Sequence, residues 1–169
     1  MTKNMVIGLS KSGANNPMFG KPSPNGSGNG WSGWYKGWFF RSLRELSFMI
    51  NFIEKNGMKW VSAESKKYAI QYQDYKHNKR NYFADFMLND VELIEVKPYK
   101  LLKSKIIQIK SEAAKIWCAE RNFSYRIMTD KDFEVLTDKE VNFLIESGKI
   151  KFTDRYMEKY NARLAKIQK

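Results

Sequence analysis

Three side chains in the middle of the chain have the types and spacing of a divalent-metal site. Asp85 follows an aromatic run, and Glu95 and Lys97 lie in the apolar segment Leu93-Ile-Glu-Val-Lys. Residues two apart on a strand project from the same face, so Glu95 and Lys97 are expected side by side. Burying either charge without a partner is costly, so the pattern needs an explanation.

Two interpretations of this trio are open. In the first, Glu95 and Lys97 form an ion pair on a solvated face, which contributes under ~1 kcal/mol. In the second, Asp85 and Glu95 supply hard oxygen ligands to a divalent cation, and Lys97 stands where an attacking water must lose its proton. We favour the metal site.

The connection between the two strands decides whether the carboxylates can meet. With a two-residue turn, Asp85 would stand opposite Ile94, and Glu95 would face away from it. A three-residue loop over 89–91, or a bulge near Ala84, brings both carboxylates to one face. We therefore predict such an irregularity, and carboxylates on opposite faces would exclude the metal site.

Composition limits the other chemistry that is open to the chain. The 169 residues include one cysteine, Cys118, and one histidine, His77. These counts exclude a disulfide scaffold, a Cys-rich zinc site and His-based metal triads. Lysine and arginine total 30 against 18 acids, a formal charge of +12, which indicates a polyanionic partner such as nucleic acid. We expect His77 to lie in a polar turn and Cys118 to fill the core.

Elements that could position the trio follow from the apolar spacing. Apolar residues from Phe39 to Ile53 recur at helical spacing, and Gly57 ends that helix. A second helix is predicted over about 102–121. Strand-like runs lie at 59–63, 67–73, 82–88, 92–97 and 123–129. This order predicts an α/β fold with a small mixed sheet flanked by helices.

The composition divides the chain into three parts. Residues 1–40 hold eight of the ten glycines and no acid. Such a stretch is expected to hold neither a long helix nor a central strand. We predict an extended DNA-binding arm over 1–37 whose last aromatics, Trp31 to Phe40, pack it onto the domain. A core over 38–130 and a helical extension over 131–169 follow, where Thr137 and Glu140 match a capping box.

Asp85 and Glu95-x-Lys97-Pro98, preceded by a helical glutamate at Glu45, resemble the PD-(D/E)XK nuclease superfamily. Ala84 stands where the signature has proline, a position that is commonly degenerate. The resemblance covers about residues 38–129 and implies a restriction-endonuclease-like core.

Further patterns resemble a phage subgroup that includes small homing endonucleases and head-completion nucleases. They are Arg41-Ser42-x-x-Glu45, Ser62-x-Glu64 and Tyr82-Phe-x-Asp85. Near the start of the chain, Gly13-Ala-Asn-Asn-Pro17-Met-Phe-Gly-Lys21 resembles a nuclease-associated DNA-binding motif found beside homing nuclease domains. This motif favours a homing endonuclease over a virion-assembly nuclease.

The resemblance implies hydrolysis of phosphodiester bonds with Mg²⁺, or with Mn²⁺ as a substitute. The metal ligands would be the carboxylates of Asp85 and Glu95 and the backbone carbonyl of Val96. Lys97 would orient or deprotonate the nucleophile. Glu45 would bind a second ion or a metal-bound water, and its alternative role is a surface acid that pairs with Arg41.

The expected partner is double-stranded DNA. Candidate contacts come from the arm and from the two predicted helices, namely Lys11, Asn15, Asn16, Lys21, Lys36, Arg41, Arg44 and Lys110. Instead of contacting DNA, these residues could be ordinary solvated surface groups. Instead of packing the arm onto the domain, the arm's aromatics could stack on bases. One compact domain carries one active site, so cleaving both strands would need a homodimer or two sequential nicks.

We therefore expect a metal-dependent DNA endonuclease, specifically a site-specific phage homing endonuclease. A phage head-completion or DNA-processing nuclease, an inactive DNA-binding module and a single-strand or RNA binder remain as alternatives. No stretch approaches the ~20 apolar residues of a membrane span, and the first residues lack the apolar core of a signal peptide. We expect a soluble protein in the cytoplasm, that of the host if a phage encodes it.

Overall fold

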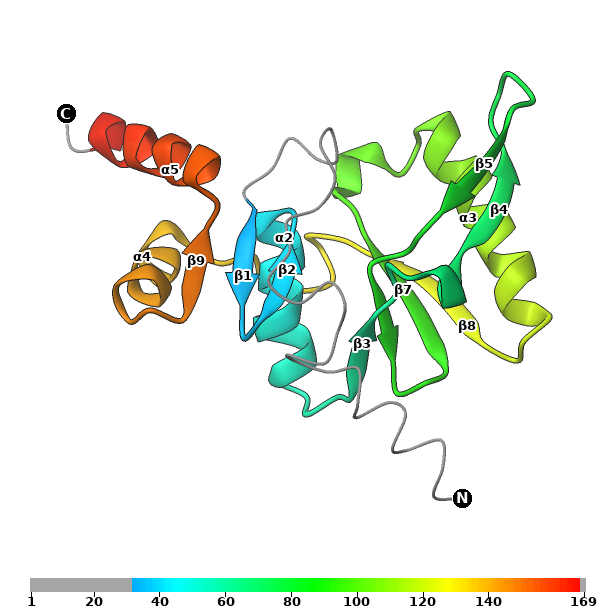
Figure 1. Ribbon diagram of the computed structural model, residues 1–169, viewed down its shortest axis with the longest axis horizontal. Helices are drawn as coiled ribbons and strands as arrows, with labels where there is room; N and C mark the ends of the chain where they lie inside the picture. Colours follow the sequence, from blue (N-terminus) through cyan, green and yellow to red (C-terminus); the bar gives the residue numbers. More distant parts are fainter. Residues whose placement is uncertain (1–31, 168–169) are drawn as a thin grey trace. The chain divides into compact units, whose positions relative to one another are not determined.

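The computed structural model describes residues 32–167. The chain forms two compact units, one from residues up to Leu46 and from Leu136 onward, the other from Ser47 to Val135. The division falls within helix α2 (Leu43–Phe48). Both units combine strands with helices (Figure 1), and the predicted α/β fold with a restriction-endonuclease-like core is confirmed.

A four-stranded mixed sheet forms the centre of the second unit. Its order is β3 (Trp60–Ser62), β6 (Phe86–Leu88), β7 (Glu92–Val96) and β8 (Ser124–Met128). The first three strands pair antiparallel, whereas β7 and β8 run parallel. A parallel pair needs a crossover connection, which helix α3 (Lys105–Ala119) provides. The runs predicted at 59–63, 92–97 and 123–129 are thus confirmed as strands.

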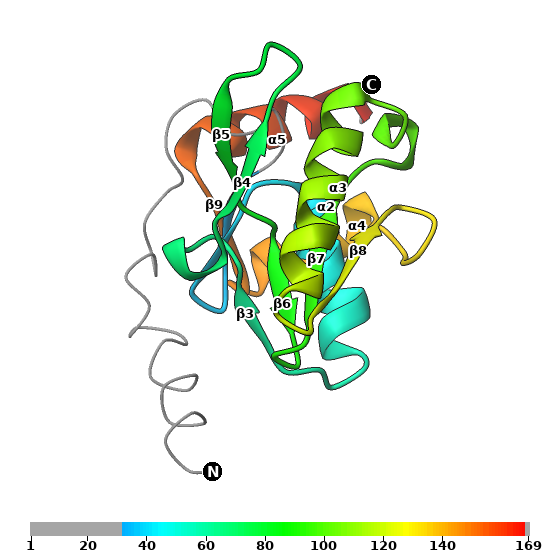
Figure 2. The same ribbon diagram turned by 90° about the vertical axis from the view of Figure 1, so that its right-hand side faces the viewer.

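Both faces of this sheet are covered. Helix α3 lies across one face (Figure 2), where Leu93 packs in one core cluster with Ala114 and Cys118. On the other face the rings of Phe48 and Phe86 lie 5.2 Å apart. A strand buried on both sides has a continuous apolar sequence rather than an alternating one, as β6 and β7 do. Cys118 fills the core, as predicted.

The prediction of one continuous strand over 82–88 is wrong. A separate hairpin of β4 (Ile70–Gln73) and β5 (Lys79–Tyr82) ends at residue 82, and the chain bends at 83–85 before β6 begins. The hairpin extends beyond the sheet (Figure 1). At the bend, Asp85 bonds to β7 through both its backbone N–H and its side chain, an arrangement that the hydrophobic pattern does not encode. Short 3-10 helices, η3 (Lys66–Tyr68) and η4 (Tyr99–Leu101), complete the unit.

The first predicted helix begins later than its apolar spacing suggested. It comprises α2 and a π-helical continuation, η2 (Met49–Glu54), and Gly57 follows with a φ of +59°. Residues 38–40 are instead a strand, β2 (Trp38–Phe40). This strand pairs with the strand before it, and apolar periodicity does not reveal such a pairing.

The first unit contains a three-stranded antiparallel sheet in which β1 (Gly33–Tyr35) lies between β2 and β9 (Ile150–Phe152). The expectation that the glycine-rich region holds no central strand is therefore wrong for residues 33–35. A Cβ atom on Gly33 would lie 2.4 Å from the carbonyl oxygen of Lys151. The absence of a side chain at Gly33 therefore lets β9 pack against β1. The sheet joins a predicted arm segment to the C-terminal extension.

Two helices follow in the first unit, α4 (Asp138–Glu146) and α5 (Asp154–Ile167). The predicted capping box is confirmed, because Thr137 Oγ1 accepts from the Glu140 N–H and the Glu140 carboxylate accepts from the Thr137 N–H. Phe40 is buried and its ring lies 6.0 Å from that of Phe152, so this aromatic serves burial, as predicted. No helix between residues 32 and 167 has the length and apolar character needed to cross a membrane.

Candidate active site

The register of β6 and β7 brings the two predicted metal ligands together. Phe86 pairs with Ile94 and Leu88 pairs with Glu92, which leaves a three-residue loop over 89–91. The same register sets position 85 opposite position 95, as the predicted irregularity requires. Asn89 and Asp90, with φ values of 48° and 61°, form the left-handed part of this loop.

Asp85 is fixed to the sheet by backbone and side-chain bonds. Its N–H donates to the carbonyl of Ile94 at 3.0 Å, and its carbonyl accepts from the N–H of Ala63 at 3.1 Å. Its Oδ2 accepts a 2.7 Å bond from the N–H of Val96. The carboxylate is therefore held at the end of β7, beside Glu95, without depending on a flexible loop.

Glu95 is a buried carboxylate, 4% exposed, on the sheet face that α3 covers. Its Oε2 accepts a 2.7 Å bond from the hydroxyl of Tyr82, and its Oε1 forms an ion pair with Lys97 Nζ. Burial raises the pKa of Glu95 to about 7; repulsion from Asp85 adds to the shift, and Lys97 opposes it. The predicted ion pair between Glu95 and Lys97 is present, but Glu95 is buried and does not lie on a solvated face.

The donor set fits a hard divalent cation. The buried carboxylate of Glu95 and the half-buried carboxylate of Asp85 repel each other, and a cation between them would relieve that repulsion. Within residues 32–167, no group of three or more His, Cys, Asp or Glu side chains is arranged to hold a metal. Two carboxylates with the Val96 carbonyl would suit Mg²⁺, which keeps several waters and commonly takes only one or two carboxylates.

Two tyrosines support Glu95, and neither was predicted from the sequence to have a role at the site. The hydroxyl of Tyr82, the last residue of β5, lies 3.1 Å from that of Tyr125 on β8 as well as bonding Glu95. Burial raises the pKa of both hydroxyls, so both stay protonated donors. The sequence carried no signal for this pair, because Tyr82 ends a polar strand and meets Tyr125 only in the folded chain.

Lys110, a predicted DNA contact on α3, lies beside this cluster. Its Nζ stands over the rings of Tyr72 and Tyr82, 5.7 and 5.4 Å from their centroids. Burial lowers the pKa of Lys110; Glu95 raises it, and Lys97 lowers it further. A second amine is therefore within electrostatic reach of the two carboxylates.

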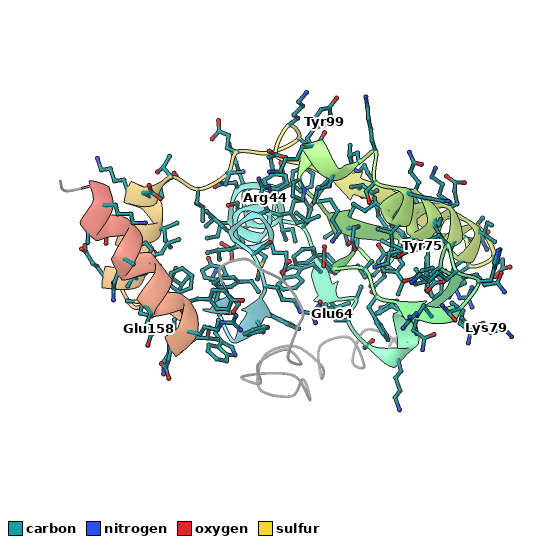
Figure 3. All side chains as sticks on the ribbon, turned by 90° about the horizontal axis from the view of Figure 1, so that it is seen from above. Arg44, Glu64, Tyr75, Lys79, Tyr99 and Glu158 are labelled. Carbon is teal, nitrogen blue, oxygen red and sulfur yellow. The ribbon has the colours of Figure 1, made fainter. Side chains whose placement is uncertain are left out.

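The other predicted contacts belong to the first unit or lie outside the described residues. Glu45 Oε2 accepts from the N–H of Arg41 at 2.8 Å, and Oε1 accepts from the Ser42 hydroxyl at 3.2 Å, so this carboxylate caps the start of α2. Its catalytic role stays a prediction, as do the DNA contacts of Lys36, Arg41 and Arg44 (Figure 3 labels Arg44). Outside the described range lie Lys11, Asn15, Asn16 and Lys21.

A mixed sheet covered on both faces, with two carboxylates and a lysine at the ends of neighbouring strands, agrees with a restriction-endonuclease-like nuclease core. Residues 58–130 match the model of the family described as TnsA-like endonuclease N terminal, a restriction-endonuclease-like family. The match includes Asp85, Glu95 and Lys97 and supports a nuclease, which implies DNA as substrate. Neither the curated proteins nor the solved structures gave a match.

Proposed function

We propose that the protein is a Mg²⁺-dependent endonuclease that hydrolyses phosphodiester bonds of double-stranded DNA, with Mn²⁺ as a substitute ion. The observation that carries the proposal is the meeting of Asp85, Glu95 and Lys97 at the ends of β6 and β7. The formal charge of +12 suits a polyanionic substrate.

Each residue at the candidate site would have its own role in the proposed reaction. Asp85, Glu95 and the carbonyl of Val96 would hold the ion, which when bound neutralises developing charge and acidifies a water. Glu95 is held by Tyr82 before substrate arrives, so it needs little reorganisation. The side chain of Lys97 is 31% exposed while it contacts Glu95, which suits an amine that orients or deprotonates the attacking water.

Charged residues of both units would bind the substrate. Lys110 lies within electrostatic reach of the carboxylates and would contact a phosphate near the cut. In the first unit, Arg41 and Arg44 would contact phosphates, and Glu45 would bind a second ion or a metal-bound water. Each chain supplies one set of these residues, so a double-strand break would come from a homodimer or from two nicks.

We further propose that the enzyme is a site-specific phage homing endonuclease acting in the host cytoplasm. The support is the motif from Gly13 to Lys21, within an acid-free arm over 1–37 that would lengthen the DNA footprint. A phage head-completion or DNA-processing nuclease is the alternative enzyme. The alternative that is not an enzyme is an inactive DNA-binding module.

A nicking assay on supercoiled plasmid tests the activity. Wild-type protein should nick with Mg²⁺ and lose all nicking in EDTA. Lys97→Ala and Asp85→Asn should stay folded and inactive, whereas Lys59→Ala, an exposed lysine before β3, should nick normally. Binding without cleavage in any divalent ion would leave the inactive module as the explanation.

Cleavage of phage genomic DNA tests the homing role separately. Discrete fragments that share one cut sequence would support a homing endonuclease. Cutting that is indiscriminate, or that starts from ends, would overturn it in favour of a processing nuclease. Removing residues 1–30 should weaken DNA binding more than single-turnover cleavage; unchanged affinity would rule out the arm as a DNA contact.

A further inference from the structure

The β4–β5 hairpin has an outer face built almost entirely from amides. Gln71 pairs with Asn81, and Gln73 pairs with Lys79. Residues directly opposite each other in an antiparallel pair share a face, and these four side chains, here called the amide face, are all exposed. The opposite face carries Ile70 and Tyr82, which belong to the core cluster.

The tip of the hairpin is held by hydrogen bonds and is positively charged. Asp74, the one carboxylate between residues 70 and 82, accepts from the N–H groups of Lys76 and Asn78 at 2.9 and 3.0 Å. It also pairs with Arg80 at 3.2 Å. Its charge is thus satisfied within the hairpin, and Lys76 and Lys79 give the projecting part its excess of positive charge.

An aromatic side chain completes the tip. Tyr75 is 57% exposed, and the amine of Lys76 lies 5.8 Å from the centroid of its ring. Tyr75 and Lys79 are both labelled in Figure 3. An exposed ring beside a cation can stack on a base while the amine contacts a phosphate.

The hairpin is joined directly to the candidate active site. Tyr82, the last residue of β5, donates to Glu95, and Asp85 follows three residues later along the chain. The hydrogen bond that holds Glu95 therefore also holds the base of the hairpin. DNA placed with a phosphate at Asp85 and Glu95 would have its neighbouring base pairs within the hairpin's reach.

We propose that the β4–β5 hairpin is a DNA-reading ribbon that enters the major groove beside the cleaved bond. This inference rests on the proposed nuclease function. The major groove of duplex DNA admits a two-stranded ribbon, and Asn and Gln recognise adenine edges there while Lys recognises guanine or phosphate. The major groove of an RNA duplex is too deep and narrow for such a ribbon, so the geometry favours DNA.

Binding of short duplexes with a randomised centre tests the ribbon, using the full chain in EDTA to prevent cleavage. The variant Lys76→Ala/Lys79→Ala should bind every duplex more weakly. Because each lost phosphate contact lowers the salt slope by about one, the affinity loss between about 50 and 200 mM salt should become about tenfold smaller. Lys55→Ala/Lys59→Ala, which removes the same charge between η2 and β3, is the matched control and should keep the wild-type slope.

The amide face has its own variant, Gln71→Ala/Gln73→Ala/Asn81→Ala. Selection from the randomised pool should yield a sequence that wild type prefers, and this variant should lose about tenfold in preference for each base contact removed. All substituted side chains are exposed, and matching circular dichroism melts would confirm folding. Methylation of adenine N6, which lies in the major groove, should weaken wild-type binding more than binding by this variant.

The outcomes separate the ribbon from the nuclease. If both hairpin variants bind and select like the control, the ribbon is wrong, whether or not wild type cleaves. If a minor-groove ligand weakens wild-type binding and base methylation in the major groove does not, the ribbon is also wrong. If wild type cleaves no duplex but the hairpin variants lose binding and selectivity, the ribbon stands and the proposed activity fails.

Discussion

The backbone N–H of Val96 donates a 2.7 Å hydrogen bond to Oδ2 of Asp85, so one candidate metal ligand is held by the residue that follows the other. Glu95 is thus positioned by strand pairing, and Asp85, in the bend before β6, by its hydrogen bonds to β7 and to Ala63. A site built on strands is held more precisely than one built on loops. This relationship separates the charge of Asp85 from its structural role, and the two can be tested apart.

Asp85→Asn should abolish nicking and leave the fold intact. The amide oxygen can still accept from Val96, but the charge that would bind the cation is lost. We expect the rate to fall by about a hundredfold or more, equivalent to about 3 kcal/mol. Asp85→Ala should be equally inactive and about 1 kcal/mol less stable, because the Val96 N–H then loses its partner. Chemical denaturation with parallel nicking assays measures both, and an active Asp85→Asn protein would contradict the metal site.

Tyr82→Phe should lower kcat by about tenfold and leave KM nearly unchanged. The ring remains in the core, but Glu95 loses the hydroxyl that orients it. Tyr68→Phe removes a hydroxyl from another tyrosine of the same core cluster and serves as the control. Single-turnover kinetics over a range of DNA concentrations separates the two parameters. Equal effects of the two variants would mean that Tyr82 only contributes stability.

Glu45→Gln tests the predicted catalytic role of Glu45 against its capping role. Ser42→Ala breaks the same capping arrangement but keeps the carboxylate charge. If Glu45 binds an ion or a metal-bound water, only Glu45→Gln should lower nicking, by about tenfold or more. Both should lose at most about 1 kcal/mol of stability. Full activity in Glu45→Gln would assign this carboxylate to capping alone.

Asp74 should remain ionised in acid well below the range of an ordinary aspartate. Desolvation opposes ionisation, but hydrogen bonds from Asn78, Lys76 and Arg80 lower the pKa of Asp74 to about 2. A folded-state pKa below the unfolded one stabilises the hairpin above about pH 4, and that contribution is lost as the pH falls toward 2. The carboxyl carbon shift measured by NMR should still be that of the ionised form at about pH 3. A midpoint near 4 would contradict the hydrogen bonds to Asp74 at the tip.

Gly33→Ala should destabilise the first unit more than Gly148→Ala. A Cβ at Gly33 would meet backbone atoms of β9 at 2.4 and 2.8 Å, and backbone cannot step aside as a side-chain end can. Gly148 has a φ of +69° and open space around its Cβ position, so alanine there costs about 1 kcal/mol of backbone strain. Thermal melts of the two variants give the comparison, and equal melting temperatures would contradict close packing of β1 on β9.

Much of the candidate site could be predicted because its signals are local. Charged residues in an apolar strand identified Glu95 and Lys97, and the parity of the connection predicted the loop over 89–91. Tyr82 and Tyr125 were missed because they meet across 43 residues, and a single sequence carries no signal for such a pair. The central strand at Gly33 was missed for the same reason, since its partner, β9, lies more than a hundred residues later.

What the amino-acid order settled by itself was the chemistry on offer: two carboxylates, one amine and a surplus of positive charge, in a chain with one histidine and one cysteine. Folding then decided which of these groups meet, that Glu95 is buried beside Asp85 and bonded to Tyr82, and that Gln71, Gln73, Lys79 and Asn81 share one exposed face. Residue types and turn lengths act over a few positions, whereas strand register, burial and electrostatic coupling depend on segments that come together only in the folded chain.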